Sequence, residues 1–80
     1  MSGWLLKHIH APHECGVAVA AWKGFQSPLR SHAALDTCRE GGHAIWWVVE
    51  ASGPDHALQQ LPPYVAARTQ AVPISEVLIP

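Results

Sequence analysis

The sequence predicts an α+β fold in which strands and helices follow one another in the order β-α-β-β-α-β. The first observation behind this prediction is the stretch 43–51, an apolar run rich in β-branched and aromatic residues, which is typical of a strand covered on both faces. The second is Gly41-Gly42, a hairpin signal directly before this strand. The third is a pair of short helical patterns over 12–24 and 54–61, each with a proline near its start.

The first half of the chain begins with a strand that is predicted over residues 4–10. Its side chains alternate between two faces, so His8 and His10 point the same way. In the helix that follows, Cys15 and Trp22 fall on the apolar side. Both are interpreted as core residues, because free cysteines and large aromatic side chains usually serve that role.

The second half of the chain supplies the remaining strands. Residues 34–39 form a weaker strand candidate, which the hairpin pairs with 43–51. The last strand is predicted over 69–79, with a bulge near 75–76 because the alternation of apolar residues changes phase there. Pro73 lacks an N–H donor, so this strand is expected at an edge of the sheet.

Right-handed crossovers place both helices on one face of a four-stranded antiparallel sheet, a ferredoxin-like arrangement with the first and third strands in the middle. The other face of the sheet is left bare. We expect Ile45, Trp47 and Val49 to pack under the helices. Trp46 and Glu50 fall on the bare face, where a polar group is easier to satisfy.

Length and composition set the class of protein. The 80 residues (8.7 kDa) are expected to form a single domain, 1–80, near the lower size limit for independent folding. Only 14% of the residues are charged although 49% are apolar and four are tryptophans. We therefore expect part of the apolar surface to be buried in an interface, and predict a homodimer through the bare sheet face.

Charge and hydropathy exclude several partners. The formal net charge of −1 provides no basic surface for nucleic acid, and no apolar run is long enough to span a membrane. No signal-peptide pattern is present at the N-terminus, and two cysteines do not form a disulfide framework of the secreted kind. A cytoplasmic location is expected.

Two stretches, residues 41–51 and 57–64, resemble the dimeric α/β-barrel superfamily of ferredoxin-like proteins. Within them, Leu61-Pro62-Pro63-Tyr64 is similar to the corresponding region of muconolactone isomerases, and Val49-Glu50-Ala51 ends its strand as in several small members of unknown function. The resemblance implies two sheets that face each other around an enclosed cleft. The superfamily includes isomerases, heme-linked enzymes, cofactor-free monooxygenases and ligand sensors. No complete catalytic motif of these proteins is visible, so no catalytic residue is carried over.

Six histidines and two cysteines raise the question of a metal site. His8 and His10 could chelate an ion from one strand. Four further side chains could complete a ligand set only if the fold brought them together: His13, His32, Cys38 and His43. Because no Cys-x-x-Cys pair or two-histidine helical motif is present, we expect no metal site and no cofactor. Cys38 and His43 flank the hairpin and form an alternative thiolate–imidazole pair, which lacks an evident third orienting group.

A few other side chains are candidates for binding or chemistry. Glu50 ends an apolar strand, and desolvation in a cleft would raise its pKa and suit it to acid–base catalysis. His8 and His10 are the other candidate bases. Four residues are expected to line a binding cleft: Trp46, Trp4, Tyr64 and Glu50.

Three functions remain open from the sequence. The favoured one is binding of a small apolar or aromatic molecule in a cleft between two subunits. A cofactor-free isomerase or monooxygenase and a structural dimerisation module without chemistry are the alternatives.

Overall fold

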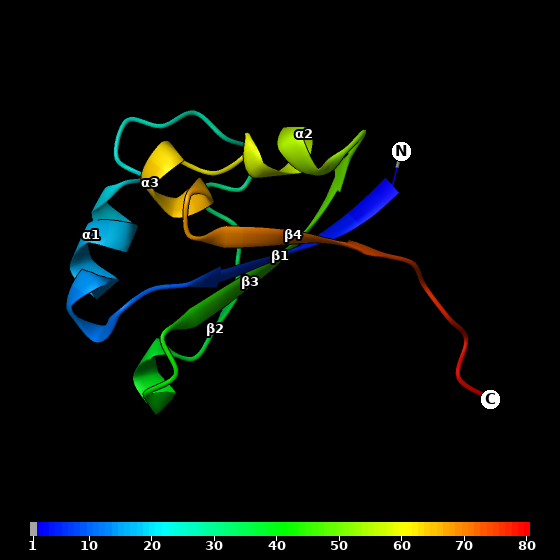
Figure 1. Ribbon diagram of the computed structural model, residues 1–80, viewed down its shortest axis with the longest axis horizontal. Coiled ribbons are helices and arrows are strands. Elements are labelled where there is room, and N and C mark those ends of the chain that lie inside the picture. The colour runs from blue at the N-terminus through cyan, green and yellow to red at the C-terminus, as the bar shows by residue number, and fades with distance from the viewer. Residues whose placement is uncertain (1) are drawn as a thin grey trace.

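Four strands pair in one antiparallel sheet in the order β2-β3-β1-β4 (Figure 1). The computed structural model describes residues 2–80. Its strands are β1 (Ser2–Ile9), β2 (Leu35–Asp36), β3 (Ala44–Ala51) and β4 (Thr69–Ile74). The register of β1 on β3 runs from Ser2 opposite Ala51 to Ile9 opposite Ala44. The first and third strands therefore occupy the centre of the sheet, as predicted, and β4 with its Pro73 lies at an edge.

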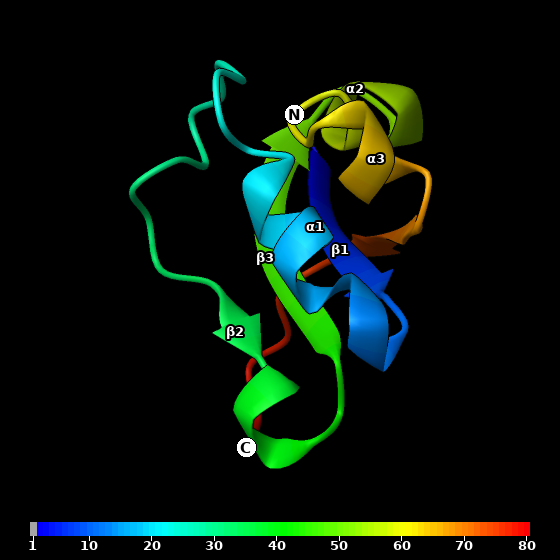
Figure 2. The same cartoon turned by 90° about the vertical axis from the view of Figure 1, so that its left-hand side faces the viewer.

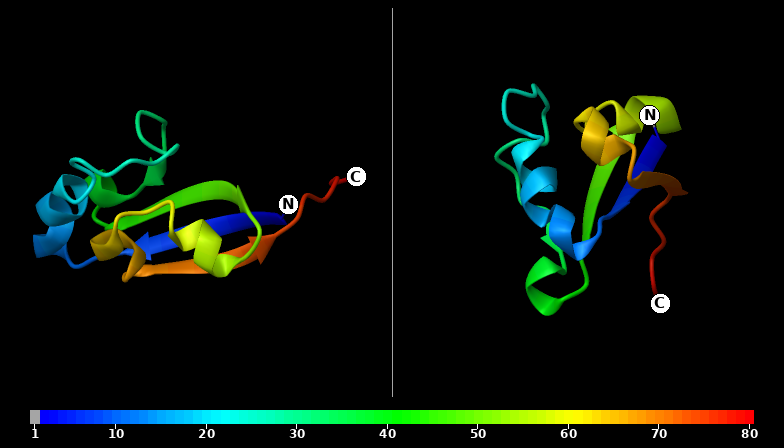
Figure 3. Two further views of the ribbon diagram at one scale, coloured as in Figure 1. Left: turned by 90° about the horizontal axis from the view of Figure 1, so that it is seen from above. Right: turned by 60° about the vertical axis from the view of Figure 1, so that its left-hand side comes forward.

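Short helices cover one face of the sheet (Figures 2 and 3). α2 (Pro54–Leu58) packs on β1, β3 and β4, and α3 (Pro63–Ala66) packs on β4. The 3-10 turn η1 (Pro12–Glu14) and α1 (Cys15–Ala20) follow β1 at the end of the sheet where that strand leaves it. None of the helices in this part of the chain, residues 2–80, has the length and apolar character needed to cross a membrane.

The core lies between the helices and the sheet face that they cover. Its buried side chains are Leu6, Trp47, Val49, Ala51, Ala57, Leu61 and Val65. Along β3 the exposed fraction alternates: Trp47 is 9% exposed and Val49 6%, whereas Val48 between them is 69% exposed. The prediction that Ile45, Trp47 and Val49 face the helices is confirmed, because Ile45 also packs against this core.

The other sheet face, hereafter the bare face, presents apolar side chains to solvent. Ile9, Leu35 and Val48 project from it and are all more than half exposed. Residues 75–80 run away from the sheet as an extended segment (Figure 1), and the apolar side chains Val77, Leu78 and Ile79 on it are exposed. Within residues 2–80 nothing covers this apolar surface.

Four elements are shorter than predicted. In place of the helix expected over 12–24, the chain forms η1 (Pro12–Glu14) and α1, which ends at Ala20. β2 spans two residues instead of 34–39, because the Asp36 carboxylate accepts the Cys38 N–H at 3.0 Å and turns the chain into the 3-10 turn η2 (Cys38–Glu40). The predicted helix over 54–61 ends at Leu58, and a separate helix starts at Pro63. β4 ends at Ile74, so the expected bulge beyond it does not form.

Candidate functional site

Four side chains that can bind a metal converge at the end of the sheet where β1 leaves it. They come from the residue after β1, the start of α1, η2 and the turn before β3: His10, Cys15, Cys38 and His43. One potential ligand atom of each lies within 4.8 Å of the other three. His10 Nε2 is 3.2 Å from Cys15 Sγ and 3.5 Å from Cys38 Sγ, and Cys15 Sγ is 3.1 Å from His43 Nδ1. These four residues are called the His–Cys cluster below.

Two compact turns of equal length place the cluster. His10 and Cys15 flank η1, and Cys38 and His43 flank the hairpin turn, with four residues between the members of each pair. The two turns are joined directly, because the His10 N–H donates to the His43 carbonyl at 3.2 Å. In the hairpin both Gly41 (φ 87°) and His43 (φ 54°) adopt the left-handed conformation. For a histidine this conformation is uncommon and costs of order 1 kcal/mol or more, so the surrounding contacts hold it in place.

The separations within the cluster are close to those of a tetrahedral metal site. With Zn–S bonds of about 2.3 Å and Zn–N bonds of about 2.0–2.1 Å, neighbouring ligand atoms lie roughly 3.3–3.8 Å apart. The three contacts of 3.1, 3.2 and 3.5 Å fall near this range, and the widest separation of at most 4.8 Å needs to close by about 1 Å. His10 is only 5% exposed, whereas the other three side chains are half-buried.

The pKa of Cys38 argues against a reactive nucleophile in the cluster. Burial lowers the pKa of the neighbouring His8 and keeps its imidazole neutral. Partial burial, and then the Cys15 thiol beside it, raise the pKa of Cys38, whereas a reactive cysteine needs a lowered one. The hydrogen bonds also pair Cys38 with His10 and His43 with Cys15, which differs from the Cys38–His43 pair that the sequence suggested.

The predicted binding residues do not gather in one cleft. Trp4 lies on the helix-covered face, packs against the core and donates its indole N–H to the Ala51 carbonyl at 3.2 Å. Trp46 lies on the bare face, opposite Lys7 of β1. Within one chain Trp4 and Trp46 therefore project from opposite faces of the sheet, and a cleft between two subunits that both residues line stays a prediction.

Tyr64 takes part in a surface network at the end of α3. Its hydroxyl donates to the Glu14 carboxylate, which also pairs with Arg68 at 3.0 Å. The Arg68 guanidinium stacks over the Tyr64 ring at 3.8 Å from the centroid. The Tyr64 hydroxyl, then the backbone N–H of Ala11, lower the pKa of Glu14 to about 2. This network ties η1 to α3 and explains Tyr64 without a ligand.

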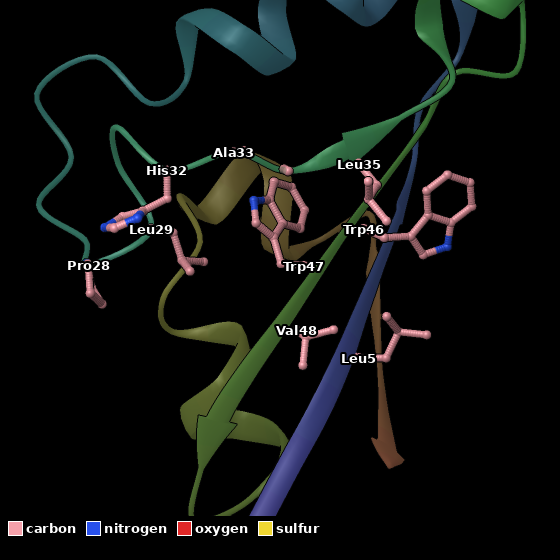
Figure 4. A pocket seen from close by; sticks show the side chains of 10 residues that line it. Leu5, Pro28, Leu29, His32, Ala33, Leu35, Trp46, Trp47 and Val48 are labelled. Carbon is pink, nitrogen blue, oxygen red and sulfur yellow. The ribbon is translucent and has the colours of Figure 1, made fainter. Parts of the chain in front are cut away.

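An apolar pocket opens beside Trp46, where the loop before β2 passes over the edge of β3 (Figure 4). Its volume is about 500 Å³. Besides Trp46 and Trp47 it is lined by Leu5, Pro28, Leu29, His32, Ala33, Ala34, Leu35 and Val48. Glu50, the predicted acid or base, is exposed and lines a different depression with Val48 and Glu76. The pocket beside Trp46 therefore has aromatic walls and no carboxylate.

The chain matches no protein-family model, no curated protein and no solved structure. Its function has to be inferred from the chemistry of its own residues.

The His–Cys cluster is the arrangement that sequence reasoning missed. His10 was a candidate base, Cys15 a core residue, and Cys38 and His43 a separate pair, while the lack of a familiar ligand motif argued against a metal. The signal was the mirrored spacing, with a histidine five positions before Cys15 and another five positions after Cys38. The expectation of no metal site assumed that these side chains lie apart, whereas the fold brings them together.

Proposed function

We propose that this protein binds one divalent transition-metal ion, with Zn²⁺ as the best fit, through the His–Cys cluster. The observation that carries the proposal is the convergence of two imidazole nitrogens and two thiol sulfurs within 4.8 Å of one another. This donor set is the one that Zn²⁺ takes in closed structural sites. Mg²⁺ and Ca²⁺ prefer oxygen ligands, so the cluster selects against them.

The role of such an ion is structural, because four protein ligands leave no coordination position for a substrate. It would fasten the end of β1, the start of α1 and the β2–β3 hairpin to one another. These segments bury few side chains of their own. α1 has six residues and buries only Ala18, and β2 has two residues, both of them exposed. Small domains often add a metal or disulfides, since a small core contributes little stability.

Substitution with Co²⁺ tests the proposal directly. Tetrahedral Co²⁺ with thiolate ligands gives intense visible bands and a sulfur-to-metal charge-transfer band, and both are expected on titration to one equivalent. Cys38→Ser removes one sulfur and is expected to reduce the charge-transfer band and weaken binding. His32→Ala is the matched control, because His32 is exposed and stands outside the cluster. A weak octahedral spectrum that is the same in native protein and both variants would contradict the proposal.

A second function is favoured by the bare face and by the pocket beside Trp46. We propose that two bare faces meet in a homodimer, the ferredoxin-like dimeric α/β-barrel arrangement that the sequence resembles. The exposed Ile9, Leu35 and Val48 support this, since monomers rarely leave such a patch uncovered. A small apolar or aromatic molecule would then bind between the subunits against Trp46. A cytoplasmic location, where thiols stay reduced, suits both proposals.

Light scattering on surface variants tests the dimer. Val48→Lys places a charge in the proposed interface and is expected to give a monomer at tens of micromolar. Val19→Lys is the control, because Val19 is 70% exposed on α1 and lies off the bare face. A native protein that is monomeric at this concentration would overturn the dimer.

A further inference from the structure

His8 lies directly behind the His–Cys cluster and connects it to α3. Its side chain is completely buried, and both ring nitrogens have partners. His8 Nδ1 lies 3.2 Å from the Val65 carbonyl oxygen and 3.1 Å from the Thr69 hydroxyl oxygen. His8 Nε2 lies 3.0 Å from His10 Nδ1. A row of hydrogen bonds therefore runs from Val65 through His8 to His10.

Whether a ring nitrogen in this row carries a hydrogen follows from whether its partners can donate one or can only accept. The Val65 carbonyl only accepts, and it already accepts the Thr69 hydroxyl hydrogen at 2.6 Å. The Thr69 oxygen, having given its hydrogen to Val65, can also only accept from His8. Both partners of His8 Nδ1 are thus acceptors, so the hydrogen of the neutral His8 ring is on Nδ1.

The same reasoning fixes His10. With its hydrogen on Nδ1, neutral His8 has a lone pair at Nε2, which accepts the hydrogen of His10 Nδ1. Neutral His10 is left with a lone pair at Nε2. This atom is the one that lies 3.2 Å from Cys15 Sγ and 3.5 Å from Cys38 Sγ.

We propose that His8 is a positioning residue, which selects the His10 tautomer that presents its Nε2 lone pair to the metal. The inference rests on the proposed metal-binding function. Metal-binding histidines generally donate their other N–H to a fixed acceptor, which orients the ring and strengthens the ligand. A neutral imidazole suits this place because two thiolates already balance the charge of a divalent ion. A carboxylate there would be a buried charge without a partner.

Two amide variants of His8 distinguish selection of the His10 tautomer from simple packing of the buried side chain. The Gln oxygen can reach the position of the imidazole Nε2, so His8→Gln keeps an acceptor for His10. The shorter Asn side chain reaches only the position of Nδ1, so His8→Asn keeps the contact to Val65 and loses the one to His10. Loss of such an outer partner costs roughly 10–100-fold in metal affinity. We expect a Zn²⁺ affinity within a few-fold of native for His8→Gln and a loss of that size for His8→Asn.

The tautomer itself can be read in the metal-free protein from the ¹⁵N chemical shifts of the His10 ring. Protonated Nδ1 is expected in the native chain and in His8→Gln, and a mixture in His8→Asn, with circular dichroism showing that all three are folded. If the native chain binds neither Zn²⁺ nor Co²⁺, the proposed function fails and with it the ligand role of His10. If the native chain binds Zn²⁺ but both variants match its affinity, or if native His10 is protonated at Nε2, only the role of His8 is overturned.

Discussion

Truncation of Trp47 to alanine tests which sheet face forms the core. The Trp47 side chain is 9% exposed, and its ring lies 5.8 Å from that of Trp22 and 6.4 Å from that of His8, between centroids. Replacing a buried tryptophan with alanine costs roughly 3–5 kcal/mol. A domain of this length has a free energy of unfolding of about 4–12 kcal/mol. The variant therefore loses a large share of its stability, which corresponds to a fall in melting temperature of roughly 12–40 °C.

The neighbouring Trp46 provides the control, because the two side chains are alike in chemistry and differ in the face from which they project. Urea unfolding of both variants is measured by circular dichroism with one equivalent of Zn²⁺ present. Trp46→Ala is expected to stay close to native in midpoint and to weaken self-association or the binding of apolar molecules. A Trp46→Ala chain that unfolds while Trp47→Ala remains a stable monomer would refute the assignment of the two faces.

Three further predictions concern the metal, the acid range and the pocket. If free Zn²⁺ is present at 100 times its Kd, its removal by a strong chelator lowers the free energy of unfolding by about 2.7 kcal/mol and the melting temperature by roughly 10–20 °C. An unchanged thermal transition would argue against a structural ion. The pKa of Glu14 is lowered in the folded chain to about 2 from an ordinary 4.5, so its contribution to stability is present above pH 4.5 and lost as the pH falls toward 2. In the metal-free protein Glu14→Gln should therefore match the native chain near pH 2 and be less stable at neutral pH; equal stability at both would contradict the Tyr64 and Arg68 contacts. An apolar fluorophore is expected to quench tryptophan emission in the native protein and less in Trp46→Ala, and equal quenching would place its site elsewhere.

Local patterns predict most of the sheet because they act over a few residues. Alternation along 43–51 correctly separates Trp47 from Trp46, and the lack of an N–H at Pro73 correctly places β4 at an edge. The lengths of β2 and the second helix are harder to predict. The side chain of Asp36 captures the Cys38 N–H and ends β2, a competition between side chain and backbone that apolar periodicity does not report.

The candidate site depends on contacts that are distant in sequence, which explains why it was not predicted. His10 and Cys38 meet only because the antiparallel pairing of β1 and β3 places the end of β1 beside the start of β3. Each half of the cluster is a histidine–cysteine pair across a tight turn. This spacing does not match a familiar metal-binding motif. The tautomer of His10 is harder still to predict, because it depends on His8, which in turn depends on its contact with Val65 of α3.

Native mass spectrometry of the purified protein after incubation with Zn²⁺ tests the central claim most directly, since it reports the ions bound to each chain. We predict one zinc ion for each 8.7 kDa chain, retained in His32→Ala and lost or much reduced in Cys38→Ser. Folded chains that carry no zinc, or that carry the same amount of zinc in Cys38→Ser as in the native protein, would contradict the assignment of the His–Cys cluster as a metal site.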